Sequence, residues 1–339
     1  MKIYREKNYV TSNPLIWEKP YLKLGDGSFF VAKVIFTGFR FESKMIPYGP
    51  VIFRHYDRNK DKILGYDDGC CCVAELKFQD IVTNPVQETP ASMYIYPFWL
   101  IHSVFLTMQL SVDYWIGMDR IYYFNAKGKN VGTSGSDRTK LADSWLKATE
   151  SIVKRFDKKR FLKLMSAQFG NLELAIDRYS RACTEIVDES IIDFVVVLEN
   201  LLSVAEEKEI AHRISVRASM ILSTKVEERE KYYDVIKFFY NLRSRMVHGE
   251  IDEIEYNQKN QKILIDCGAK LTGKWYEDKY EISNLARKIT RRVLLYFIDH
   301  EDKRNKKYLK YLDLGIKKNK KNGIRSVKIF GGGEEAVEG

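Results

Sequence analysis

The residues with the clearest chemical potential lie close together, in the segment RSRMVHG at positions 243–249. The imidazole of His248 can take up and return a proton near neutral pH. The guanidinium of Arg243 offers a planar fork of donors that matches phosphate oxygens. RNA brings its own nucleophile, the 2′-hydroxyl, so a histidine that moves a proton and an arginine that stabilises the phosphorane are the groups that its cleavage needs. The segment thus indicates phosphodiester chemistry without a metal or other cofactor.

The same segment also has a purely structural interpretation. Apolar residues at three- and four-residue spacing predict an amphipathic helix over about 230–249. Gly249 is the residue type that most readily takes the left-handed conformation that ends a helix. A histidine in the last turn is stabilised by the helix dipole with no catalytic role. Ser244 lies four residues before His248 and therefore shares its face of the helix. The spacing of Arg243 and His248 is a short pattern that also arises by chance, so the catalytic and the structural interpretations both stay open at this point.

Other catalytic patterns are missing from the sequence. It contains no GxSxG, HExxH or dinucleotide-binding fingerprint, and the glycines of residues 126–137 do not match a phosphate-binding loop. Three of the five cysteines are consecutive, at 70–72, and none has a CxxC partner. Adjacent cysteines cannot all face one ion, so the sequence predicts no zinc site.

Composition narrows the class of partner. The chain has 339 residues, a formal charge of +10 and a pI near 9.1, which favour an acidic partner, with nucleic acid first among candidates. A hydrophobic content of 45% is typical of a folded protein. The N-terminus has no apolar core of a signal peptide, and the longest apolar run, 191–205, is too short and too polar to cross a bilayer. These features predict a cytoplasmic protein with no membrane association.

Hydrophobic periodicity predicts an α+β protein with its strands first. Residues 1–125 contain short β-branched and aromatic runs separated by turn-forming residues, whereas 97–118 fit either a helix or a strand pair. Residues 126–140 are rich in Gly, Ser and Lys and predict a linker. From Leu141 to about residue 300 the helical period predicts an antiparallel bundle, with the nearly all-apolar segment 191–205 as its central helix and 251–280 irregular.

Residues 301–339 form a basic tail with a small, acidic end that is expected to be disordered. Tyr308 and Tyr311 lie among its lysines and could stack on an unpaired RNA strand. The alternative is a solvated terminal helix without such a role. The tail residues assigned to substrate binding are Lys317, Lys318, Lys320 and Lys321.

Residues of about 172–298 resemble a HEPN domain, specifically the Apea-like HEPN branch of bacterial proteins. The resemblance lies in AIDRYSRACTE, ESIIDFVVVLENLL, HRISVRASMIL and KFFYNLRSRMVHGE, in that order, and the last carries an Arg-x4-His motif. It implies an all-α bundle that pairs symmetrically and acts as a metal-independent endoribonuclease. Arg243 and His248 of two protomers would then meet in one cleft.

The resemblance also implies roles for neighbouring residues. Ser244 follows the arginine at a position that is usually Asn, Asp or His in the family, so it is polar but departs from that set. Arg245, Glu199 and Arg217 would form ion pairs that fix the helices, and Arg245 is a further candidate for substrate binding.

We therefore expect a homodimeric endoribonuclease that acts as a toxin or anti-phage defence effector. Residues 1–125, which resemble no family that we can name, would sense a phage-derived or cellular trigger. The alternatives are a non-catalytic module that binds RNA or nucleotides, and a protein-interaction module.

Overall fold

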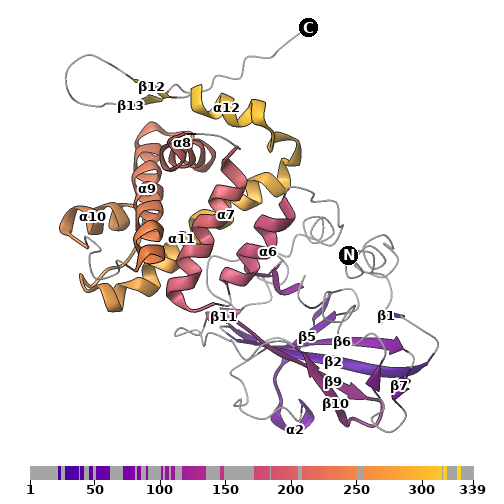
Figure 1. Cartoon of the computed structure of the whole chain (residues 1–339). Helices are drawn as coiled ribbons and strands as arrows, with labels where there is room; N and C mark the ends of the chain where they lie inside the picture. Colours follow the sequence, from indigo (N-terminus) through magenta and orange to yellow (C-terminus); the bar gives the residue numbers. More distant parts are fainter. Residues whose placement is uncertain are drawn as a thin grey trace. The chain divides into compact units, whose positions relative to one another are not determined.

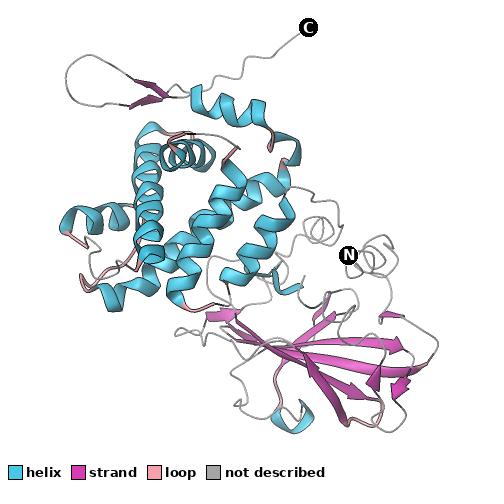
Figure 2. Cartoon of the chain, viewed as in Figure 1, coloured by secondary structure: helices cyan, strands magenta, loops and turns pink. Residues whose placement is uncertain are grey.

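The structure is a computed structural model, and it divides the chain into two compact units. One comprises residues 1–170 with 183–185, and the other comprises 171–182 with 186–339. The residues that the structure describes are 22–23, 27–37, 39–41, 46–48, 51–61, 72–80, 82–84, 89–90, 101, 104–106, 108–110, 117–134, 146–148, 172–183, 185–204, 208–249, 256–314, 316–318 and 327–329. Strands dominate the first unit and helices the second, so the predicted α+β class, with its helical C-terminal part, is confirmed (Figure 2).

The first unit is built on one sheet, with strand order β10-β9-β2-β6-β5-β4 and with β1 parallel to β6. The neighbours along this path are antiparallel. Two smaller pairs are β11 with β3 and β7 with β8. The strands are β1 (Leu22–Lys23), β2 (Ser28–Thr37), β3 (Phe39–Phe41), β4 (Ile46–Tyr48), β5 (Val51–His55), β6 (Cys72–Asp80), β7 (Val82–Asn84), β8 (Thr89–Pro90), β9 (Gly117–Asn125), β10 (Asn130–Ser134) and β11 (Leu146–Ala148).

Alternation along β2 explains the two faces of the sheet. Phe30, Ala32 and Val34 are buried, whereas the intervening Val31 and Lys33 are partly exposed, because successive side chains of a strand point to opposite faces. Helical residues at 101, 104–106 and 108–110 are buried, and the ring of Phe105 stacks on Phe36, with 5.8 Å between centroids. These described positions are helical, whereas Gly117 and Met118, at the end of the ambiguous stretch 97–118, belong to β9.

The predicted domain boundary at residue 125 is wrong, and so is the predicted linker over 126–140 as far as residue 134. β9 continues through a tight turn into β10, and the two strands pair antiparallel (Figure 1). The side chain of Asn125 accepts hydrogen bonds from the backbone N–H groups of Lys127 and Lys129, at 3.1 and 2.9 Å. Gly128 takes a positive φ of 75° in this turn, a conformation that glycine adopts without strain.

The predicted helix that begins at Leu141 is also contradicted where the structure describes it. Residues Leu146–Ala148 form β11, which pairs in parallel with β3. The described helical bundle begins near Leu172 instead. Strand pairing with β3, about a hundred residues earlier in the chain, overrides the local helical period.

The second unit is a helical bundle organised around α7. α7 packs against α6, α8, α9 and α11, and its apolar residues are buried on nearly all sides, which confirms the predicted central helix (Figure 1). The helices are α6 (Glu173–Ala182), α7 (Val187–Leu202), α8 (Ile210–Leu222), α9 (Val226–His248), α10 (Gln258–Asp266), α11 (Trp275–Asp299) and α12 (Lys306–Leu314), with α2 (Arg58–Asp61) in the first unit.

Two segments of the bundle differ from their predictions. The stretch 251–280, predicted irregular, contains α10 and the first turn of α11. Asn257 caps α10, because its side chain accepts a hydrogen bond from the N–H of Asn260. The predicted tail contains α12, which packs on α8 with Leu309 and Leu312 buried. The acidic end lies outside the described residues.

Candidate functional site

α9 carries the predicted catalytic residues and ends as the sequence indicates. Phe238, Leu242 and Met246 are buried along one side. Gly249 closes the helix with φ 75° and ψ 13°, and its N–H bonds to carbonyl oxygens of the last turn. The left-handed conformation at Gly249 fixes where α9 stops, so His248 lies in the final turn.

Arg243 points from α9 to α7. Its Nη1 donates to Oε1 of Glu199 at 2.8 Å, and the guanidinium lies 6.0 Å from the centroid of the Tyr240 ring. The side chain of Arg243 remains 27% exposed, so it reaches the surface. Its Nε is buried and has no hydrogen-bond partner among the described residues. A buried N–H of this kind is rare in native proteins.

Glu199 is the centre of a small charged cluster. The pKa of Tyr240 is raised by burial first and also by the negative charge of Glu199, which accepts a hydrogen bond from the phenol; Arg243 opposes this shift. Glu199 and Arg217 were both expected to form ion pairs that fix helices, and both do so. Glu199, however, takes as its partner the predicted catalytic arginine.

Arg217 is fully buried, and it joins α8 to α12. Its Nε and Nη2 donate to the two carboxylate oxygens of Asp313 at 2.9 and 2.7 Å, and its Nη1 donates to the carbonyl of Leu202 at 2.6 Å. Arg213 donates to the same carboxylate at 2.7 Å. This arrangement is structural, since it holds the last described helix onto the bundle.

His248 and Ser244 are exposed, and they share a face of α9 that Arg243 does not. At 100° per residue, Ser244 and His248 are about 40° apart around the helix, whereas Arg243 and His248 are about 140° apart and about 7.5 Å apart along the axis. Arg243 faces α7, and His248 faces away from it. Within one chain the two predicted catalytic residues therefore start from different sides of the same helix.

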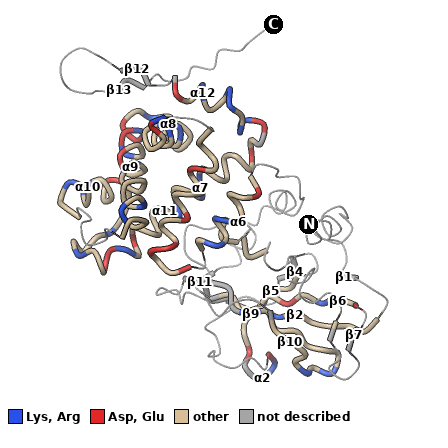
Figure 3. The backbone as a smooth tube through the Cα atoms, in the orientation of Figure 1, with Lys and Arg blue, Asp and Glu red and all other residues tan. Residues whose placement is uncertain are grey.

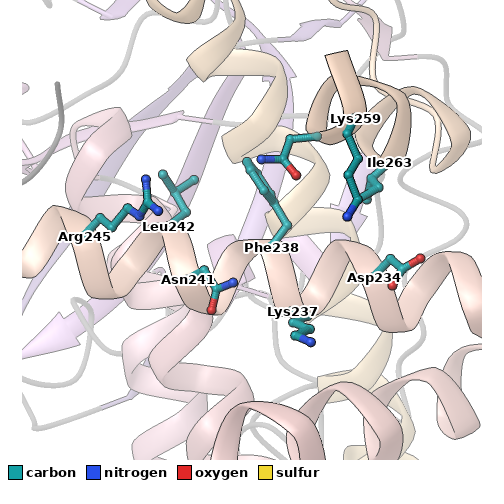
Figure 4. Close-up of a pocket in the computed structure, with 9 residues that line it drawn as sticks. Asp234, Lys237, Phe238, Asn241, Leu242, Arg245, Lys259 and Ile263 are labelled. Carbon is teal, nitrogen blue, oxygen red and sulfur yellow. The ribbon is translucent and has the colours of Figure 1, made fainter. Parts of the chain in front are cut away.

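Arg245 lies on the His248 side and lines a groove between α9 and α10, hereafter the α9/α10 groove (Figure 4). The groove has a volume of about 370 Å³. Its charged lining residues are Asp234, Lys237, Arg245 and Lys259. Sequence reasoning identified Arg245 and missed the other three. Their signal was a polar repeat at 234, 237, 241 and 245, but only the structure shows that α10 forms the second wall.

Two of the four predicted substrate-binding lysines of the tail lie on a strand pair whose second strand, β13, contacts α9. Lys317 and Lys318 belong to β12 (Ile316–Lys318), which pairs with β13 (Val327–Ile329), and their side chains are not described. Lys320 and Lys321 lie outside the described residues.

The two tyrosines proposed to stack on RNA belong to α12. Tyr308 hydrogen-bonds through its hydroxyl to that of Tyr296, and its ring stacks on those of Tyr296 and Tyr311, at 6.4 and 6.1 Å between centroids. Tyr311 is 59% exposed. Tyr308 therefore packs within the bundle, and Tyr311 presents the more accessible ring.

The described parts of the chain contain no group of three or more His, Cys, Asp or Glu residues arranged to hold a metal ion. The acidic residues of α9 lie in its first half, as do those of α11 apart from Asp299, whereas Lys and Arg predominate in the second half of each helix (Figure 3). The positive charge in this part of the bundle is therefore local, as in the α9/α10 groove, and does not spread over a whole helix.

These features place the candidate residues in the helical unit of an α+β chain. Comparison of the chain with protein-family models, with curated proteins and with solved structures found no match. None of the helices in the described ranges is long and apolar enough to span a membrane.

Proposed function

We propose that this chain is a cytoplasmic, metal-independent endoribonuclease that acts as a homodimer, in the manner of the HEPN domains that its helical segments resemble. The observation that carries the proposal is the end of α9. An exposed His248 occupies the last turn of α9, and five residues earlier Arg243 reaches the surface with 27% of its side chain exposed, while its Nη1 donates to Glu199. The accessible donors of such a guanidinium suit the oxygens of a phosphate.

The chemistry follows from these two side chains. His248 takes the proton from the 2′-hydroxyl, whose oxygen attacks phosphorus while the bond to the 5′ oxygen breaks. The protonated imidazole returns its proton, through water, to that 5′ oxygen, so His248 is regenerated. Arg243 stabilises the negative charge of the phosphorane, and Glu199 orients its guanidinium through the 2.8 Å contact. The products are a 2′,3′-cyclic phosphate and a 5′-hydroxyl.

The placement of the two residues on different sides of α9 supports a dimeric site. A single helix end presents His248 to one side and Arg243 to another, so a second copy supplies the missing partner in this proposal. Val247, next to His248, is 58% exposed and offers an apolar contact beside the site. In the cell such an enzyme would act as a toxin or anti-phage effector, with the sheet unit responding to a trigger.

The test is cleavage of a synthetic single-stranded RNA in the presence of EDTA. The wild-type chain is compared with His248→Ala, Arg243→Ala and Lys262→Ala, the last an exposed residue of α10 that does not line the groove. Loss of a positioned acid–base group lowers the rate by about 10²–10⁴-fold, so His248→Ala should be nearly inactive, and Lys262→Ala should equal wild type. Equal cleavage by wild type and His248→Ala would overturn the proposal.

Two further measurements bear on the dimer and the cellular role. Activity per chain should rise with protein concentration through the dimerisation range. Inducing the wild-type chain in bacteria should stop growth and fragment total RNA, and the His248→Ala chain should do neither.

A second candidate function is a module that binds RNA without cleaving it. The placement of Arg243 and His248 on different sides of α9 favours this function if the chain acts as a monomer. In that case Arg243 and His248 do not meet on one phosphate, and the cationic groove beside His248 retains the strand. Wild type would then bind RNA and leave it intact.

A further inference from the structure

One side of α9 forms a continuous polar surface that leads to His248. At 100° per residue, Asp234, Lys237, Asn241 and Arg245 fall within a sector of about 80°, and His248 lies inside that sector. With a rise of 1.5 Å per residue, the four groove residues extend over about 16 Å of helix, and Arg245 is about 4.5 Å along the axis from His248. The α9/α10 groove therefore ends beside the proposed proton-transfer residue.

The charges of the groove favour an anionic ligand. Lys237, Arg245 and Lys259 line it against one carboxylate, that of Asp234. Burial raises the pKa of Asp234, although the positive charges of Lys237 and Lys259 act in the opposite direction. The groove is thus shielded enough from water to perturb a carboxyl group, and electrostatic contacts are stronger in such a setting than on an open surface.

The rest of the lining is suited to a flat, partly apolar ring. Phe238, Leu242 and Ile263 contribute apolar surface, and Phe238 and Leu242 are 8% and 2% exposed. Asn241 and Asn260 add amide groups, which can both donate and accept hydrogen bonds. Figure 4 shows Phe238 and Leu242 projecting from α9 on the same side as Arg245, with Lys259 and Ile263 coming from α10. A free inorganic anion would leave this apolar wall without a partner.

We propose that the α9/α10 groove is a subsite for one nucleotide of a single-stranded RNA, with the base against Phe238 and Ile263 and the phosphate between Arg245 and Lys259. The volume of about 370 Å³ lies at the small end of the range for ligand pockets, about 300–1,000 Å³, and suits a single nucleotide. This inference rests on the proposed function for the identity of the strand. The inference specifies the place where the nucleotide next to the scissile phosphate is held, because Arg245 lies about one helical turn from His248.

The test measures RNA binding by the full chain carrying His248→Ala, which prevents turnover. The probes are a fluorescein-labelled single-stranded RNA hexamer and an abasic hexamer of the same length, followed by fluorescence anisotropy over a series of salt concentrations. Lys259→Ala and Lys262→Ala are compared in this background. Both remove an exposed lysine from α10, but only Lys259 lines the groove. A third variant, Asn241→Trp, fills the groove from an exposed position on α9.

Lys259→Ala should weaken binding roughly tenfold and lower the slope of log affinity against log salt by about 0.7, the value for one phosphate contact to a single strand. Lys262→Ala should change affinity less than about twofold, since Lys262 is exposed and does not line the groove, so that it makes no direct phosphate contact in this proposal. The parent chain should prefer the normal hexamer over the abasic one by roughly fivefold or more, because stacking contributes to binding. Asn241→Trp should remove that preference, with its helical circular dichroism unchanged.

Equal weakening by Lys259→Ala and Lys262→Ala, or equal affinity of the parent chain for the two hexamers, would overturn the subsite. The absence of RNA binding by the parent chain would do the same. These outcomes are separate from the cleavage test. Groove-dependent binding by a wild-type chain that leaves RNA intact would refute the nuclease and keep the subsite. Cleavage that depends on His248 but not on Lys259 would refute the subsite and keep the nuclease.

Discussion

Replacing Asp313 by alanine should destabilise the helical unit more than any exposed charge of the bundle does. The substitution leaves Arg217 buried, with 0% of its side chain exposed, and removes both oxygens that accept from its Nε and Nη2. Breaking a buried ion pair by deleting one partner costs about 3–5 kcal/mol. The side chain of Asp313 is 21% exposed, so water can partly replace it, and we expect a value near the lower limit, about 3 kcal/mol.

The assay is thermal unfolding of the full chain, followed by the helical circular dichroism signal. For a unit of this size, about 1 kcal/mol corresponds to about 2–4 °C in melting temperature, so Asp313→Ala should lower it by about 6–12 °C. The matched control is Arg213→Ala, which removes the other arginine that contacts the same carboxylate but is 37% exposed. Its effect should stay below about 1 kcal/mol. If the two variants melted at the same temperature, the claim that Arg217 depends on this counter-ion would be refuted.

Two more predictions concern the ends of helices. Gly249→Ala should lower the free energy of unfolding by about 1–2 kcal/mol, the cost of a left-handed backbone for a residue with a Cβ. Gly249 has φ +75°, and a Cβ there meets nothing within 4 Å, so no steric clash adds to this cost. Chemical denaturation measures the change, and an unchanged free energy would show that α9 ends without this constraint. Burial acts to raise the pKa of Asp278, but hydrogen bonds from Thr272, Tyr256 and Gly273 outweigh it and the pKa lies below its usual value. Asp278 therefore stabilises the fold at neutral pH, and this contribution is lost as the pH falls below about 4 towards the lowered pKa. The difference in stability between wild type and Asp278→Asn should accordingly shrink between pH 7 and pH 3, and a constant difference would contradict the assignment.

Local patterns predicted the elements that depend mainly on interactions between neighbouring residues, or whose residues are nearly all apolar. The β-branched and aromatic run of β2, the nearly all-apolar α7 and the glycine stop of α9 were each visible in the sequence. They were visible because periodicity and capping depend on neighbours within a few residues. The polar β10 was missed, since its Gly- and Ser-rich composition is that of a linker, and only pairing with β9 makes it a strand.

The candidate site was predictable in part for the same reason. The sequence placed Arg243 and His248 at one helix end, and the helical period could have shown that they face different sides. The partner of Arg243 could not be found in this way, because Glu199 lies 44 residues earlier on another helix. The α9/α10 groove likewise requires the packing of two helices, which no pattern within either helix specifies.

The link between α8 and α12 also has a consequence for how the protein is made. Arg217 is synthesised 96 residues before Asp313. At about 5–20 residues per second, translation separates the two by roughly 5–20 s. During that interval Asp313 is not available to Arg217, and the two bonds that its carboxylate accepts from the buried guanidinium are not formed. A chain that ends before α12 therefore lacks the bonds from Arg217 to Asp313 that hold α12 onto α8, and its helical unit is less stable than that of a chain whose synthesis has passed residue 313.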